Sequence, residues 1–265
     1  MGQEARTLAW EAFVACDPDR SCALARRAAQ AAEEGNIDPD RRFADLRPGW
    51  PEGLRFVRPA LLPKRGFHTR AKHRALVHAI AHIEYSAIKL ALDAAVRYAG
   101  LPLAFYQDWL RIAAEEAYHF ELIRAHLRHL GGEYGELPVH GELWHAAERT
   151  KDDLLARLAV VPRVLEARGL DVNPKLQDEA RAAGDEHLAD LLSIIFRDEI
   201  GHVRAGSRWF HRLCAQKGLN PAQTWQELVV RYFLGRLPPG DAALRAEAGF
   251  LPEEVAAFQA LTGEG

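Results

Sequence analysis

Apolar residues recur every three or four positions from residue 67 to residue 217, with charged residues between them. This spacing places the apolar side chains on one face of an α-helix, and it is typical of helices that bury one side. Glycine and proline interrupt the pattern at residues 100–102, 131–132 and 184. The sequence therefore predicts four long helices, over residues 68–99, 103–130, about 150 to 184, and 185–217.

The third of these helices depends on a geometric argument. Residues 169–174 resemble a loop, but a turn there would lie three residues from Glu166 and twenty-five from Glu199. A turn at Gly184 instead puts both glutamates roughly 21–27 Å from the turn, at about 1.5 Å per residue. We therefore expect one helix that Pro162 perturbs, that is bent or broken just after Glu166, and that resumes in the same direction at residue 174.

The links between the helices set their directions. The first two helices are joined by a short turn, and so are the last two, so each pair should be antiparallel. Residues 131–148 are then the long crossover between the pairs. Thr150 is a plausible N-cap for the third helix, with Asp152 and Asp153 in its first turn.

Both ends of the chain add shorter elements. Residues 3–17 and 19–35 predict N-terminal helices, and residues 221–235 and 252–261 predict C-terminal ones. Residues 37–66 cannot form a long helix because they contain Pro48, Pro51, Pro59 and Pro63, so an extended arm is predicted. The expected fold class is all-α, a four-helix bundle with flanking helices. Its predicted segments, which we expect to form one structural domain, are residues 1–66, 67–217 and 218–265.

The candidate chemistry is one pattern that occurs twice. A lone glutamate, Glu84, precedes Glu116-x-x-His119 by 32 residues, and Glu166 precedes Glu199-x-x-His202 by 33 residues. Positions i and i+3 share a helix face, and both Glu-x-x-His pairs lie on apolar stripes. Four carboxylates and two imidazoles in one core are the ligand set of a dinuclear metal site in a four-helix bundle.

One simpler interpretation remains beside the metal site. The six residues could instead be buried ion pairs and hydrogen-bonded histidines. Buried carboxylates that lack a partner are costly, so four converging carboxylates favour a cation. A third Glu-x-x-His, Glu142 to His145, has no upstream glutamate and is interpreted as accidental.

The types of ligand limit which metal can bind and which role each glutamate can take. Oxygen and imidazole ligands without thiolate suit two Fe ions, or alternatively Mn or a mixed Mn/Fe pair. Glu116 and Glu199 are predicted to bridge the ions, with Glu84 and Glu166 as terminal ligands. Neighbouring groups, expected to orient the ligands or to pack beside them, are Glu115, Asp198 and His82. For Glu115 and Asp198 a solvated helix face is an equal alternative.

Composition bears on the cellular location of the protein and on its binding partners. No run of about 18 apolar residues predicts a membrane span, and the N-terminus does not resemble a signal peptide. Three cysteines leave one unpaired in any disulfide scheme, which favours reduced thiols in the cytoplasm.

Residues 41–74 form a basic arm with ten Lys/Arg and two acidic residues, a net charge of +8. The whole chain carries −3, so the remaining residues carry −11. We expect this basic arm to lie on an acidic bundle. The alternative is a nucleic-acid-binding surface.

With these motifs together, the chain resembles the ferritin-like di-iron carboxylate superfamily. Within it, the chain is most similar to a bacterial family catalogued only as a domain of unknown function, and more distantly to the non-haem di-iron tRNA hydroxylase. The stretches that carry the likeness are Ala79-Ile-Ala-His82-Ile-Glu84, Glu115-Glu-Ala-Tyr-His119-Phe, Arg163-Val-Leu-Glu166-Ala-Arg-Gly-Leu-Asp171 and Arg197-Asp-Glu-Ile-Gly-His202-Val. The resemblance implies a ferritin-like bundle and a di-iron site that reacts with O2. Tyr118 and Gly201 stand where di-iron monooxygenases have arginine.

Four functions fit this pattern. The first is an oxidoreductase, monooxygenase-like, that activates O2 to oxidise or hydroxylate a small-molecule substrate. The second is an oxidase that handles metal or peroxide without an organic substrate. The third is a nucleic-acid-modifying hydroxylase, which needs an exposed basic arm near the site. The fourth is a module in which a sealed metal site only stabilises the fold.

Overall fold

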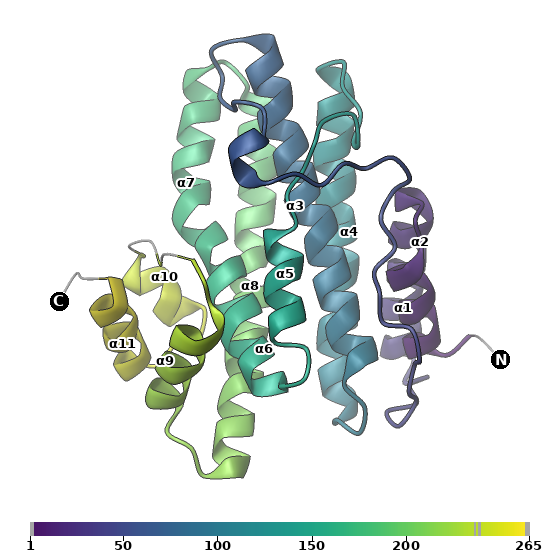
Figure 1. Ribbon diagram of the computed structural model, residues 1–265, viewed down its shortest axis with the longest axis vertical. Coiled ribbons are helices and arrows are strands. Elements are labelled where there is room, and N and C mark those ends of the chain that lie inside the picture. Colours follow the sequence, from purple (N-terminus) through teal and green to yellow (C-terminus); the bar gives the residue numbers. More distant parts are fainter. Residues whose placement is uncertain (1–2, 236, 238–239, 263–265) are drawn as a thin grey trace. The chain divides into compact units, whose positions relative to one another are not determined.

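The computed structural model describes residues 3–235, 237 and 240–262, and these are all-helical, with 71% of the chain in helices and no strands in the described ranges. The chain divides into two compact units, Met1–Gly141 and Glu142–Gly265. Figure 1 shows the helices of each unit. The predicted segments 1–66 and 67–217 therefore meet inside the first unit, and the predicted bundle contributes helices to both units.

The first unit is built on two long antiparallel helices, α3 (Arg70–Arg97) and α4 (Leu103–His129), which pack along each other. Thr69 caps α3 by accepting a hydrogen bond from the Lys72 amide, and the five-residue link to α4 contains Gly100 at φ 76°. Two N-terminal helices, α1 (Ala5–Val14) and α2 (Pro18–Glu33), pack on this pair (Figure 1). These four helices confirm the four predicted there, and each observed helix end lies within three residues of the predicted one.

A buried lysine joins the N-terminal helices to α3. Lys89 is fully buried, and its Nζ donates to the carbonyl oxygens of Ala12, Phe13 and Ala15 at 2.8–3.1 Å and to Ser21 Oγ at 2.9 Å. The carbonyls at the C-terminal end of a helix lack partners within the helix and carry partial negative charge. The Lys89 amino group therefore satisfies the end of α1 and fixes α1 against α3.

The predicted arm is extended, apart from the one-turn helix η1 (Pro59–Leu61). Backbone hydrogen bonds hold it: Gly49 N donates to Phe13 O, and residues 55–57 pair with Val139. The buried Arg6 guanidinium donates to the carbonyls of residues 38, 39 and 41 and to the Ala95 carbonyl near the end of α3. The backbone bonds and Arg6 therefore attach the arm, in addition to the ion pairs that some of its own charges form.

Eight of the ten Lys and Arg side chains in residues 41–74 divide into two groups. Arg41 pairs with Glu4 at 3.4 Å, Arg47 with Asp45, and Arg74 with Glu136. Five others are exposed and have no carboxylate within 4.0 Å in the described part of the chain: Arg42, Arg55, Arg58, Lys64 and Arg65. The expectation that the acidic remainder compensates the whole arm is therefore wrong for these five, because they point into solvent.

The second unit contains the predicted third and fourth helices. The third is a continuous rod of α6 (Leu154–Val160), a π-helical turn (Val161–Glu166) and α7 (Ala167–Ala182), and it packs on α8 (Glu186–Lys217). The turn between α7 and α8 lies at Gly184, as the level argument predicts, and Pro174 stands inside α7. Thr150 is not the cap of this helix: Asp153 caps it, and Thr150 Oγ1 bonds the carbonyls of Ala146 and Ala147 instead.

The predicted break near Glu166 is a change of helical register. Pro162 has no N–H to donate to the carbonyl of residue 158, so an α-helical ladder cannot continue through it. The turn widens instead, and Ala167 N donates to Pro162 O, five residues back. Gly206 on α8 makes the space: an added Cβ there would lie 2.5 Å from Pro162 Cβ. The helix continues because α8 accommodates the proline ring.

Four short helices complete the second unit. They are α5 (Glu142–Arg149), α9 (Pro221–Tyr232), α10 (Ala242–Glu247) and α11 (Pro252–Thr262). The sequence predicts α9 and α11, and it misses α10 and α5, which occupies most of the second half of the predicted crossover. The fully buried Trp225 of α9 donates from Nε1 to the Ala159 carbonyl of α6 and so fixes α9 on the rod.

One described helix, α3, is long and apolar enough to cross a membrane, but 83% of its most apolar stretch is buried inside the fold. A core helix of a soluble protein passes the same test. Cytoplasmic location stays a prediction.

We expect the Lys89→Met variant to lower the free energy of unfolding by about 2–4 kcal/mol, because it leaves buried carbonyls without a donor. Urea denaturation followed by circular dichroism measures this. The matched control is Lys175→Met, since the Lys175 side chain is 82% exposed and should change stability little. A Lys89→Met variant as stable as the control would contradict the role of the Lys89 amino group.

Candidate metal centre

The first set of predicted ligands meets in the first unit. Glu84 on α3 faces Glu116 and His119 on α4, and all three side chains are buried. His119 Nδ1 lies 3.4 Å from Glu116 Oε2 and 3.6 Å from Glu84 Oε2. One ligand atom from each residue lies within 4.8 Å of the other two, a spacing that one metal ion can span. The donor set of two carboxylates and an imidazole fits Fe or Mn.

The electrostatics of this set favour a cation. Burial opposes a charge on His119, but hydrogen bonding and charge from Glu116 and Glu84 outweigh burial and raise the pKa of His119 to about 11. Without metal, the ring therefore holds a proton between the two carboxylates. A metal ion would compete with that proton for the imidazole nitrogen, so metal binding here would release a proton.

The second set lies in the second unit. Glu199 and His202 are one turn apart on α8, with His202 Nδ1 3.7 Å from Glu199 Oε2. His202 is fully buried and the Glu199 side chain is 13% exposed. Glu166 is the last residue of the π-helical turn, which packs on α8. The sequence prediction that the two sets share a metal pair stays a prediction, since each unit is described by itself.

The acids beside the ligands form ion pairs on their own helices. Glu115 accepts from Arg111 Nη1 at 2.6 and 2.7 Å. Asp198 lies 3.8 Å from Arg197 Nε. Both are partly exposed, as the solvated-face alternative expects, and their predicted role in orienting histidine ligands stays a prediction. The Glu142 and His145 pair is exposed, which agrees with its interpretation as accidental.

His82 is engaged at both ring nitrogens and is not available as a direct ligand. Its Nδ1 lies 2.9 Å from Tyr134 Oη and its Nε2 lies 3.1 Å from the His140 carbonyl. Burial lowers the pKa of His82 to about 4, so the ring is neutral at pH 7. One turn away, His78 Nε2 accepts from the amides of Gly135 and Leu137. These histidines fix residues 134–140 over α3, two residues from Glu84.

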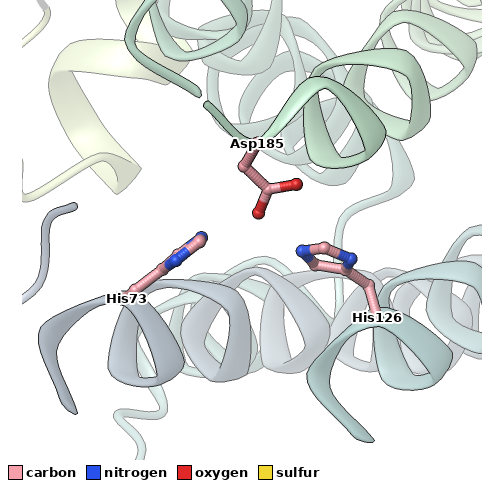
Figure 2. Close-up of side chains that lie close together, drawn as sticks. All are labelled: His73, His126 and Asp185. Carbon is pink, nitrogen blue, oxygen red and sulfur yellow. The ribbon is translucent and has the colours of Figure 1, made fainter. Parts of the chain in front are cut away.

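Two further histidines lie near each other on the same helix pair. Figure 2 shows His73 of α3 and His126 of α4, whose ring centroids are 6.3 Å apart. His73 also packs against Phe67, with ring centroids 5.0 Å apart. Asp185, drawn in the same figure, caps α8 in the second unit by accepting from Leu188 N. Neither histidine follows a motif in the sequence, and Tyr134 lies in a loop, so only the packing reveals these contacts.

Comparison with known proteins identifies relatives. Residues 14–256 match the family described as "Protein of unknown function (DUF455)". An "Uncharacterized protein" of Haemophilus influenzae (strain ATCC 51907 / DSM 11121 / KW20 / Rd) is 43% identical over 217 residues, which cover 78% of this chain and 74% of the relative. No solved structure matches the chain.

In metal-free protein we expect the His119 ring to remain protonated at pH 8, and Glu84→Gln or Glu116→Gln to lower its pKa by removing a neighbouring charge. Because the folded pKa of about 11 exceeds the ordinary 6.5, protonation stabilises the metal-free fold. That contribution is complete below pH 6.5 and is lost as pH rises through 11.

Long-range ¹H–¹⁵N NMR of the histidine rings between pH 6 and pH 11 measures this titration. Glu142→Gln, on the exposed pair, serves as the control. A neutral His119 ring at pH 8 in the metal-free wild type would contradict the charge assignment.

Proposed function

The chain belongs to the DUF455 family, and we propose that it is a dinuclear metal protein of the ferritin-like class that activates O2. In this proposal α3, α4, the α6–α7 rod and α8 form the four-helix bundle. Glu84, Glu116, His119, Glu166, Glu199 and His202 hold two Fe ions, or alternatively Mn or a mixed Mn/Fe pair. The reaction class is oxidation or hydroxylation of a small-molecule substrate.

The observation that carries the proposal is the buried cluster of Glu84, Glu116 and His119. Two carboxylates buried beside an imidazole are costly without a cation, and in metal-free protein a proton on His119 offsets part of that cost. The second unit repeats the same elements: a glutamate on one helix, and Glu-x-x-His on the helix packed against it. A repeated half-site on paired helices supports a shared site with two ions.

The side chains around the proposed site have defined tasks. When bound, the metal pair would supply the redox chemistry with O2. His119 loses its proton when it becomes a ligand, and Glu84 and Glu116 remain charged to balance the cations. Gly201, between Glu199 and His202, leaves open space where a side chain would stand. An organic substrate requires room of this kind beside the metals, whereas a purely stabilising metal, or metal or peroxide oxidation, does not require it.

We expect purified protein to carry about two Fe or Mn per chain. Glu116→Ala and Glu199→Ala should each lose metal, because each removes a proposed bridging carboxylate. Glu142→Ala, which changes the exposed Glu-x-x-His, should retain it. Elemental analysis of the three variants and the wild type decides this, and wild-type metal content in the first two variants would refute the site.

The same preparations test the reaction class. Metal-loaded protein is reduced without oxygen and then exposed to O2 while its absorption spectrum is recorded. A spectral change that requires Glu116 and Glu199 supports O2 activation. Loaded protein that is inert to O2, with a higher melting temperature than metal-free protein, would support a stabilising role instead.

A second candidate function rests on the arm. Arg42, Arg55, Arg58, Lys64 and Arg65 are exposed and have no carboxylate within 4.0 Å in the described ranges. Exposed, uncompensated Arg and Lys side chains attract phosphate groups. We propose nucleic-acid modification as the alternative to a small-molecule reaction, because the charge needed to bind a tRNA is available.

We expect Arg55→Ala, Arg58→Ala, Lys64→Ala and Arg65→Ala, combined in one variant, to abolish any binding of bulk tRNA. Fluorescence anisotropy at low and moderate salt measures it, with a log–log salt slope of roughly −0.7 per phosphate for single strands. Arg26→Ala, which removes a paired surface charge outside the arm, is the control. If the wild-type protein does not bind tRNA at low salt, the small-molecule reaction is the only one of these two candidates that remains.

A further inference from the structure

A buried guanidinium stands three residues before Glu166. The side chain of Arg163, on the π-helical turn, is fully buried. Its Cζ lies 4.5 Å from the ring centroid of Phe210 on α8 and 4.2 Å from that of Phe250, which precedes α11. Arg163 Nη2 lies 2.8 Å from Glu254 Oε2 on α11. The π-helical turn is thus anchored to a helix about 90 residues later in the chain.

Glu254 is itself held in place. It is fully buried, its Oε2 accepts from Leu251 N at 2.8 Å, and His211 Nε2 lies 2.8 Å from the same oxygen. Burial opposes ionisation, but the hydrogen bond with His211 and the charge of Arg163 lower the pKa of Glu254. The carboxylate therefore stays charged, and it ties α8, α11 and the π-helical turn together.

A second ion pair lies on the other side of Glu166. Arg245 of α10 binds both oxygens of Asp171 at 2.7 Å, and Asp171 stands five residues after Glu166 on α7. The Arg245 side chain is 2% exposed and the Asp171 side chain 8%. The Arg245 Cζ also lies 3.9 Å from the ring centroid of Phe258 on α11. Buried two-point pairs of this kind fix orientation as well as distance.

An irregular helix needs such anchors. A π-helical turn is less stable than α-helix, and it persists where the surrounding structure determines it. Pro162 forces the register change and Gly206 accommodates it, but neither fixes the direction of the side chain at the end of the turn. The two ion pairs hold the backbone on both sides of Glu166.

We propose that the Arg163–Glu254 and Arg245–Asp171 pairs form a clamp through which α10 and α11 position Glu166 for metal binding. This rests on the proposed function, in which Glu166 is a ligand. Arg163, Glu254, Arg245 and Asp171 are positioning residues, and they act on the metal only through the backbone that carries Glu166. The C-terminal helices thereby become part of the metal site, although they supply no ligand.

The test is Mn(II) titration of the full chain by calorimetry, comparing Glu254→Gln with the wild type. Losing an orienting partner of a ligand typically weakens metal binding about 10- to 100-fold, and we expect that loss for one of the two ions. Arg163→Lys keeps the charge and should lose less. The control is Asp153→Ala, which removes the N-cap at the start of the same rod and leaves both ion pairs of the clamp in place. It should lower the melting temperature but leave metal affinity unchanged.

Hydrogen exchange on metal-free protein separates the clamp from the metal site. We expect faster amide exchange in residues 163–167 of Glu254→Gln than of Asp153→Ala. If Glu254→Gln does not fold, Asp171→Asn tests the second pair in the same way.

Metal affinity in Glu254→Gln equal to that in Asp153→Ala would overturn the clamp, provided that Glu166→Ala weakens binding. If Glu166→Ala binds both ions like the wild type, the proposed ligand set is wrong. In that case hydrogen exchange still tests the clamp. Amide exchange in residues 163–167 that is no faster in Glu254→Gln than in Asp153→Ala would overturn it.

Discussion

Charged side chains buried among helices are the constraint that shapes both units of this chain. A buried charge is stable only where partners replace the water it has lost. Lys89 finds carbonyl oxygens at the end of α1, and Arg6 finds the carbonyls of the arm and of α3. Arg163 finds a carboxylate and aromatic rings. Each cation therefore fixes a segment that hydrophobic packing alone would leave free to slide.

The same constraint distinguishes the proposed metal-ligand cluster of Glu84, Glu116 and His119 from the structural ion pairs. Lys89 and Arg6 are surrounded by neutral oxygens whose positions the backbone sets. Glu84 and Glu116 are instead two like charges that both lie close to the His119 imidazole. A proton on His119 offsets part of this charge, and a divalent ion offsets more of it. The cluster is therefore suited to exchange a proton for a metal ion, whereas the structural pairs have no such alternative.

The π-helical turn shows how a local defect becomes a specific feature. Pro162 removes one donor from the helical ladder, and Gly206 on the neighbouring helix removes the side chain that would block the proline ring. Together they allow a wider turn in place of a kink. The turn ends at Glu166, so the irregular backbone and a proposed ligand coincide. Ligand sites often use such turns because the altered register redirects a side chain.

The sequence by itself determined the long helices. Their period of apolar residues is a local signal, and Gly100 and Gly184 mark turns that only a positive φ satisfies. It also indicated that Glu116 and His119 share one helix face, because residues three apart lie one above the other on an α-helix. The rise per residue correctly moved the turn from residues 169–174 to Gly184. The predicted interruption of the helix before residue 174 is wrong, because residues 169–174 are helical within α7.

Only the tertiary structure decided the contacts between segments distant in sequence. The cap at Asp153, the helices α5 and α10, and the attachment of the arm carry weak local signals because they are short or irregular. Whether Pro162 breaks its helix depends on Gly206, which lies 44 residues later. The partner of Arg163 is Glu254, and no periodicity links residues so far apart. Local spacing fixes which face a residue occupies, and packing alone selects the residue it meets there.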